Sequence, residues 1–205
     1  MQADRVGQAS SASLGANLLK TALQFFAVYA IFLCLIPTLL VHVEMAASIA
    51  TFASPKWQGI GLVLFMAMTT LQLICAWNLI WLGEGTPWPW DHSTRFVVAG
   101  PYRYLRHPMA LAGIVLGIAA ALIMGSWLSL VYVGIGAALW QFVLKPIEEE
   151  DMARRFQRPY IEYFQSVPAY LPRLSPYRAF VVESVASDED EEPAQNEPNP
   201  ELLLP

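Results

Sequence analysis

The chain has 205 residues, of which 56% are hydrophobic and 14% charged, and its mean hydropathy is +0.42. Soluble domains carry about 25% charged and about 45–50% apolar residues, so both departures point toward a lipid environment. The composition fits poorly with a water-soluble enzyme, a disordered protein or a nucleic-acid binder. The net charge of −5 arises at the end of the chain, because residues 183–205 hold only acidic charges and residues 1–182 are net positive.

Neither cysteine has the surroundings of a metal ligand. Cys34 and Cys75 both lie inside long apolar runs, without a histidine or a second cysteine at metal-ligand spacing. The sequence therefore predicts no metal site, and we expect both thiols to pack as small hydrophobic groups.

Two apolar runs in the first half of the chain are predicted to cross a membrane. Residues 1–17 are polar and expected to be flexible, whereas residues 18–43 and 57–82 form runs of 26 residues each. About 20 apolar residues span the hydrocarbon core, and the apolar part of a signal peptide has only about 7–15. A cleaved signal peptide is the alternative for the first run, because Ala46-Ala47-Ser48 follows it. Pro37 is expected to kink the first helix.

Residues 109–144 form a longer apolar stretch that is predicted to be a helical hairpin. A single helix of this length would reach about 54 Å, too long for a hydrocarbon core of about 30 Å. The expected break is at Gly125-Ser126. Pro108 suits the first helical position of the hairpin, and Pro146 is expected to stop or kink its second helix.

The basic residues predict the orientation of the four spans. If both termini lie on one side, eleven of the twelve Lys and Arg residues lie on that side and only Lys56 lies opposite. The positive-inside rule then places both termini and residues 83–107 in the cytoplasm.

The connection at residues 83–107 is the first candidate for function. It is dense in Gly, Pro and aromatic residues, and a loop of this length in a compact protein is usually functional or disordered. At its end, Arg106 and His107 precede a helix N-terminus, which together can cradle a carboxylate or a phosphate. The alternative is that Arg103 and Arg106 only anchor the helix to lipid headgroups.

The second candidate is the acidic run Glu148-Glu149-Glu150-Asp151, which directly follows the hairpin. A solvated face accounts for Glu150 and Asp151. At about 100° per residue one helix face cannot hold all four side chains, so at least one is expected to turn inward. An inward carboxylate near a membrane needs a cationic or hydrogen-bonding partner, and Arg106 and His107 lie on the same predicted side.

Two separated motifs in the order "GPYRYLRHPM", hairpin, "EEEDMARRFQRPYIEYFQSVPAYLPRL" carry a family resemblance. This arrangement resembles the integral membrane methyltransferases of the isoprenylcysteine carboxyl methyltransferase and phospholipid methyltransferase superfamily. The resemblance covers residues 83–175. Its matching positions are Gly100, Tyr102, Arg106-His107-Pro108, Glu148-Glu149, Met152, Phe156, Tyr160, Tyr163, Val167-Pro168 and Pro172.

The resemblance implies that S-adenosylmethionine binds between the two motifs at the cytoplasmic face. The residue chemistry agrees with it, since Arg106, His107 and a helix N-terminus suit the cofactor's carboxylate, while Glu148 or Glu149 suits its ammonium or ribose diol. No catalytic base is assigned. The expected cofactor-binding residues are Thr94, Arg95, Phe96, Val97, Tyr102, Arg106, His107, Pro108, Met109, Ala110, Glu148 and Glu149.

Three positions depart from the family pattern. The tyrosine that follows R-H-P-x in the family is Ala110 here, and the glycine after Phe156 is Gln157, for which we expect a local change of turn. The prenylcysteine enzymes carry an arginine one helical turn before the glutamate pair. That position is Leu144, with Lys145 beside it, which weakens the case for a prenylcysteine carboxylate as acceptor.

The sequence thus predicts an all-α, polytopic membrane protein with about four transmembrane helices, including a C-terminal hairpin, and a cytoplasmic cofactor site. Residues 18–82 would form two membrane helices, 83–182 a methyltransferase core, and 183–205 a disordered acidic tail. It would lie in the bacterial plasma membrane or, if eukaryotic, in the endoplasmic reticulum.

The expected activity is S-adenosylmethionine-dependent methylation of a lipophilic carboxylate or amine that enters from the bilayer, with membrane lipid and no nucleic acid as partners. The main alternative is a non-catalytic membrane binding or assembly protein that retains the scaffold. A small transporter is a weaker third reading, because Lys20 is the only charged residue inside a predicted span. The oligomeric state is not indicated.

Overall fold

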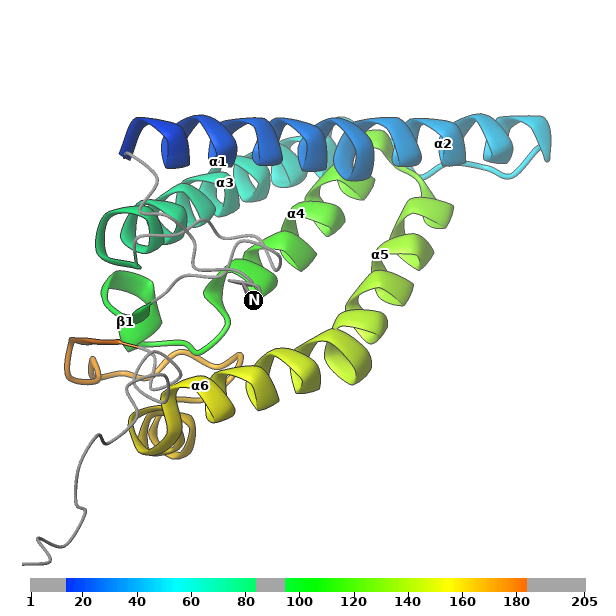
Figure 1. Ribbon diagram of the computed structural model, residues 1–205. Coiled ribbons are helices and arrows are strands. Elements are labelled where there is room, and N and C mark those ends of the chain that lie inside the picture. The colour runs from blue at the N-terminus through cyan, green and yellow to red at the C-terminus, as the bar shows by residue number, and fades with distance from the viewer. Residues whose placement is uncertain (1–13, 84–94, 184–205) are drawn as a thin grey trace, which may run out of the picture.

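The computed structural model describes residues 14–83 and 95–183 and is mainly helical (Figure 1). This confirms the predicted fold class. The helical elements are α1 (Leu14–Val28), the π-helical η1 (Tyr29–Leu35), α2 (Ile36–Ala46), α3 (Pro55–Gly83), the 3₁₀ turn η2 (Gly100–Arg103), α4 (Pro108–Met124), α5 (Trp127–Leu139), the π-helical η3 (Trp140–Leu144) and α6 (Lys145–Ser166). The strands are β1 (Arg95–Val98) and β2 (Phe180–Glu183).

The helices are long and apolar enough for a multi-pass membrane protein. Within the described residues, three stretches qualify as candidate spans, Asn17–Ala46, Pro55–Gly83 and Trp127–Ser166, and Pro108–Met124 is a shorter apolar helix. In the third stretch only residues 127–144 can lie in hydrocarbon, because charged residues begin at Lys145. Which side of the membrane each loop faces stays a prediction.

Pro37 and Pro146 are each preceded by a π-helical turn. A proline ring in an α-helix clashes with the carbonyl of the residue four positions earlier, and a wider turn before it relieves this contact. Before Pro37 the turn is η1, and the helix continues without a visible bend (Figure 1), so the predicted kink is wrong. Before Pro146 the turn is η3, and the chain changes direction between α5 and α6 rather than stopping.

The predicted hairpin turn at Gly125-Ser126 is confirmed. Gly125 ends α4 in the left-handed conformation (φ 66°), and the Ser126 side chain caps α5 by accepting a hydrogen bond from the Ser129 N–H. Close packing follows at Gly117, where a Cβ atom would lie 2.8 Å from a methyl group of Val133. From this turn α4 and α5 diverge (Figure 1), while α4 packs most extensively against α3.

A buried carboxylate fixes the hairpin turn to the first long helix. Glu44, near the end of α2, is fully buried, and its Oε1 accepts a hydrogen bond of 2.7 Å from the backbone N–H of Leu128 in the first turn of α5. The N-terminus of a helix favours negative charge, so Glu44 caps α5 from another helix. The neighbouring loop adds a hydrogen bond from the Phe52 N–H to the Gly125 carbonyl.

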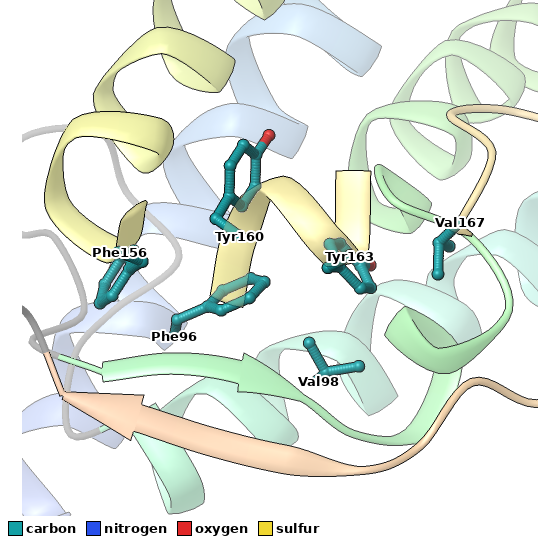
Figure 2. Close-up of a cluster of buried hydrophobic side chains, with 6 residues drawn as sticks. All are labelled: Phe96, Val98, Phe156, Tyr160, Tyr163 and Val167. Carbon is teal, nitrogen blue, oxygen red and sulfur yellow. The ribbon is translucent and has the colours of Figure 1, made fainter. Parts of the chain in front are cut away.

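At the other end of the hairpin, a small sheet and the second half of α6 enclose an aromatic core (Figure 2). Strands β1 and β2 pair antiparallel, with Arg95 opposite Glu183. The Phe96 ring, 4% exposed, contacts four other aromatic rings. The buried members of this core are Phe96, Val98, Phe156, Tyr160, Tyr163 and Val167.

The second half of α6 reaches the aromatic core because the helix bends sharply at Gln157. This residue has φ 43° and ψ −127°, a conformation that suits glycine and strains residues with a Cβ atom. Gln157 therefore has a strained backbone in a conformation that suits glycine. The expected change of turn relative to the family stays a prediction. Pro159 follows in the second segment of α6, which carries Tyr160 and Tyr163 into the core.

The expected boundary of the acidic tail falls inside an ordered element. Glu183, which the sequence assigned to the tail, is the last residue of β2 and forms an ion pair of 3.2 Å with Arg95. Residues 1–13, 84–94 and 184–205 lie outside the described residues. Of the N-terminal residues 1–17 that were expected to be flexible, residues 14–17 belong to α1, so that boundary was wrong.

We predict that Glu44→Ala destabilises the protein by about 2 kcal/mol, because a buried N–H at the start of α5 loses a charged acceptor. Unfolding in detergent micelles measures this free energy. Glu44→Gln keeps an oxygen acceptor and is expected to lose less. An alanine variant as stable as the unmodified protein would show that this contact does not hold the turn.

We also predict that Gln157→Gly stabilises the protein by about 1 kcal/mol, because glycine adopts this backbone conformation without strain. The Gln157 side chain is exposed, so its removal costs little packing. Gln157→Ala is the matched control, since it shortens the side chain but keeps the Cβ atom. Equal stabilities of the glycine and alanine variants in the same unfolding measurement would contradict the prediction.

Candidate functional site

His107 and Glu149 join the start of α4 to the first turns of α6. His107 is the last residue before α4, and its Nε2 lies 3.0 Å from Oε1 of Glu149, although 42 positions separate the two. Both side chains are largely buried, with 6% and 16% of their surfaces exposed. The two sequence motifs therefore meet in one place, at the open end of the hairpin.

One oxygen of Glu149 is the centre of a charged cluster. Besides His107, Oε1 of Glu149 lies 3.4 Å from Nε of Arg106 and 4.0 Å from Nζ of Lys145. The Arg106 guanidinium also stacks on the Phe164 ring at 3.8 Å and donates a hydrogen bond to the Phe164 carbonyl. A single carboxylate thus faces two full positive charges.

His107 is held in its neutral form. Burial lowers its pKa, and the charges of Arg106 and Lys145 lower it further, against the opposing effect of Glu149. In the neutral ring that donates Nε2–H to Glu149, the other nitrogen, Nδ1, is a hydrogen-bond acceptor. This nitrogen lies 3.9 Å from Oε1 of Glu148. His107 and Glu148 therefore present two acceptors to the same space.

Glu148 is the accessible carboxylate of the site. Burial by the surrounding protein raises its pKa to about 7, and the like charges of Glu149 and Asp151 raise it too. Its side chain nevertheless keeps 56% of its surface exposed, so a ligand can reach it. A carboxylate that titrates near neutral pH beside an accepting imidazole nitrogen suits a cationic or hydroxylated ligand.

The other two members of the acidic run face outward. Glu150 pairs with Arg154 at 2.6 Å, and 65% of its side-chain surface is exposed. Asp151 pairs with Arg155 at 3.4 Å. Glu149 is therefore the residue of the run that turns inward, as helical geometry requires of at least one of them.

Backbone hydrogen bonds fix the loop that presents Arg106 and His107. The Tyr163 hydroxyl donates to the Tyr102 carbonyl at 2.7 Å, and the N–H of Arg106 donates to the Pro168 carbonyl at 2.9 Å. Tyr177 and Arg103 exchange two further bonds, in which the Tyr177 N–H and the Arg103 Nε–H are the donors. The aromatic core and the segment after α6 thereby position the site.

Trp140 and Tyr170 form an aromatic pair on one side of the site. This side is next to η3, where the apolar segment ends. The Trp140 ring stands edge-on to His107, with ring centroids 5.2 Å apart, and edge-on to Tyr170 at 6.0 Å. The Tyr170 hydroxyl donates a hydrogen bond to Oε1 of Gln141, and Nζ of Lys145 lies 5.3 Å from the Tyr170 ring centroid. Tyr170 thus connects the segment after α6 to η3.

The structure brings together only part of the expected cofactor-binding set. Arg106, His107, Glu148 and Glu149 converge, and Pro108, Met109 and Ala110 form the adjoining first turn of α4. Tyr102 lies close enough to Glu148 for its charge, after burial, to raise the pKa of the phenol. Thr94 is outside the described residues, Arg95 pairs with Glu183, and Phe96 and Val97 are buried.

Four residues of the site were not predicted from the sequence as site residues: Trp140, Gln141, Lys145 and Tyr170. Of these four residues, only Lys145 could have been predicted from the sequence, because it lies four residues before Glu149 and so shares its helix face. The family's arginine position, Leu144, is 50% exposed and faces outward instead. No sequence pattern places Tyr170 beside Trp140.

Apolar helices long enough to span a membrane, with a charged and partly buried cluster at one end, fit an integral membrane protein. The family model for phospholipid methyltransferases matches residues 57–159, just over half of the chain. The chain belongs to this family, and its class is that of the membrane methyltransferases. A search of curated proteins gave no match.

Proposed function

We propose that the protein transfers a methyl group from S-adenosylmethionine to a lipophilic acceptor, a carboxylate or an amine, at the cytoplasmic face of the membrane. The observation that carries the proposal is the convergence of His107 with Glu148 and Glu149 at the end of the apolar hairpin. Family membership supports methyl transfer to a lipid substrate.

The residues present fit the cofactor. Within the described residues, Nε of Arg106 is buried and makes no hydrogen bond, although it lies near Glu149. With the first turn of α4, this donor suits the carboxylate of S-adenosylmethionine. On the other side, Glu148 and Nδ1 of His107 are acceptors for its ammonium or ribose diol.

The protein's own contribution to the reaction is positioning. When bound, S-adenosylmethionine supplies a methyl group already activated by a sulfonium, so the acceptor must only be held in line with it. Such positioning can supply roughly 7–11 kcal/mol. The fixed loop around Arg106 and His107 and the aromatic pair Trp140–Tyr170 provide a rigid frame for it. We assign no catalytic base.

A non-catalytic binding or assembly role is the second candidate. Ala110 favours it, because a family tyrosine in the first turn of α4 is replaced by a small residue and a ring and a hydroxyl are missing. A protein of this second kind would show no methyl transfer to any membrane lipid, which mass spectrometry of lipids from cells with and without the gene would reveal.

We predict that His107→Ala and Glu148→Gln each weaken S-adenosylmethionine binding roughly thirty-fold or more, because the first removes an acceptor and the second removes the negative charge that faces a cationic ligand. Calorimetry on the full-length protein in detergent measures the dissociation constants. Glu150→Gln, on the exposed face of α6, is the matched control and is expected to change binding less than twofold. If neither His107 nor Glu148 affects binding, the proposed cofactor site is wrong.

Cofactor affinity should also depend on pH through Glu148. Its pKa of about 7 means that acid neutralises the carboxylate that receives the ligand's cation. Affinity is therefore expected to rise about tenfold between about pH 6 and about pH 8. Burial lowers the pKa of His107, which moves the protonation of its ring toward the acid side of this range. In Glu148→Gln the rise should disappear; a rise that persists in this variant would assign the titration to another group.

A further inference from the structure

Two leucines project from the segment that follows α6. Leu171 and Leu174 lie in the proline-rich connection between α6 and β2, and their exposed fractions are 78% and 104%. The described part of the chain therefore covers little of Leu171 and nothing of Leu174. An apolar side chain of this size gains free energy when it leaves water, so two uncovered leucines three positions apart indicate a partner surface.

The backbone that carries these leucines is fixed to the loop before α4. Three backbone hydrogen bonds connect the two segments. They join the Arg106 N–H to the Pro168 carbonyl at 2.9 Å, the Arg173 N–H to the Tyr104 carbonyl at 2.9 Å, and the Tyr177 N–H to the Arg103 carbonyl at 2.8 Å. Leu171 and Leu174 thus project from a backbone that is held on both sides, so little chain entropy is lost when a partner covers them.

Tyr170, the residue before Leu171, lies beside the end of the apolar helix. Its ring stands edge-on to Trp140 with centroids 6.0 Å apart, and its hydroxyl donates a hydrogen bond to Gln141. Residues 127–144 contain no Asp, Glu, Lys or Arg, and 18 helical residues span about 27 Å, close to the thickness of the hydrocarbon core. Trp140 lies about one turn before the end of this run, at the level where tryptophan and tyrosine are enriched in membrane proteins.

The helix surface at this level is also apolar. Phe142, Leu144 and Ile147 are 77%, 50% and 61% exposed, whereas the side chain of Lys145, the first charged residue, is only 14% exposed. A bilayer that covers these three apolar side chains extends to the level of Tyr170. Leu171 follows directly in the chain and therefore lies at the boundary between lipid and water.

The polar groups of the segment are suited to such a boundary. Of the residues 168–177, three are prolines, which have no N–H, and the N–H groups of Arg173 and Tyr177 are bonded within the protein. The Arg173 guanidinium, between the two leucines in sequence, donates to the Ser166 carbonyl at 3.0 Å and so turns toward the protein. Few donors and no outward charge between the leucines lower the cost of contact with lipid.

We propose that residues 170–174 form an interfacial anchor, in which Leu171 and Leu174 insert between the lipid headgroups and the first acyl carbons. The anchor lies on the side of the membrane where the charged cluster around Glu149 lies. The inference concerns a lipid surface and does not depend on methyl transfer. Because the same backbone bonds hold the loop of Arg106 and His107, the anchor fixes the height of that loop relative to the bilayer.

The test measures the depth of spin labels on the full-length protein in vesicles of phosphatidylcholine and phosphatidylglycerol. Cys34→Ala removes the exposed thiol, and the buried Cys75 stays unlabelled. Labels are then placed at Leu174→Cys, at Phe142→Cys as the lipid reference, and at Arg154→Cys as the water reference on the exposed face of α6. Power saturation gives the collision rates with oxygen, which enriches in acyl chains, and with a water-soluble nickel chelate.

The ratio of oxygen to nickel collisions at Leu174→Cys should exceed that at Arg154→Cys about fivefold and lie closer to that at Phe142→Cys, because an interfacial side chain is buried below the headgroups. A ratio equal to that at Arg154→Cys would place the leucine in water and overturn the proposal. Low collision rates with both reagents would show that protein, such as a second copy of the chain, covers this surface, which would also overturn it.

A second measurement tests whether the leucines themselves hold the segment in the bilayer. Leu171→Ser combined with Leu174→Ser removes the apolar surface and leaves the backbone bonds in place. A label at Ser175→Cys should then collide with the nickel chelate about threefold more often, because the segment moves toward water. Val181→Ser is the matched control, since it changes an exposed apolar residue of β2 outside the anchor. An unchanged collision rate in the double variant would contradict the anchoring role.

Discussion

The structure around the site depends on a requirement that a largely buried carboxylate be neutralised. Oε1 of Glu149 meets this requirement with cations from both ends of the hairpin, because Arg106 lies just before α4 and Lys145 begins α6. The apolar helices between them diverge from their turn (Figure 1) and cannot set that distance themselves. Buried ion pairs contribute little net stability but penalise any arrangement that leaves one charge alone. The cluster therefore selects one geometry at the mouth of the hairpin.

Features governed by local chain chemistry were predictable from the sequence. The lengths of the apolar runs, the Gly125-Ser126 turn and the outward direction of Glu150 follow from helix geometry and capping, and the structure has all three. The pairing of β1 with β2 was not predictable, because it joins segments 85 positions apart whose four-residue strands carry no distinctive pattern. The same holds for Phe96, whose burial depends on aromatic rings contributed by α6 and β2.

At Pro37 and at Gln157, the backbone that the residue prefers conflicts with the helix around it. Pro37 was expected to kink its helix, yet the π-helical turn η1 accommodates the ring and the axis continues. Gln157 stands where the family has glycine, and the backbone keeps a glycine-like conformation because the aromatic core needs the bend. At Pro37 a wider local turn accommodates the ring, and at Gln157 the packing of the aromatic core overrides the preference of the residue. Sequence reasoning alone cannot weigh either effect.

Under the proposed function, the site has two parts, one for each substrate. Arg106, with Phe164 and the segment after α6, forms a part built from polar backbone and charged groups, which suits a water-soluble cofactor. Trp140, Gln141 and Lys145 form a part at the end of an apolar helix, where a lipid headgroup would lie. His107 and Glu149 stand between the two parts. A reaction that joins a soluble donor to a membrane-bound acceptor requires such a boundary, because each substrate must stay in its own solvent until the reacting atoms meet.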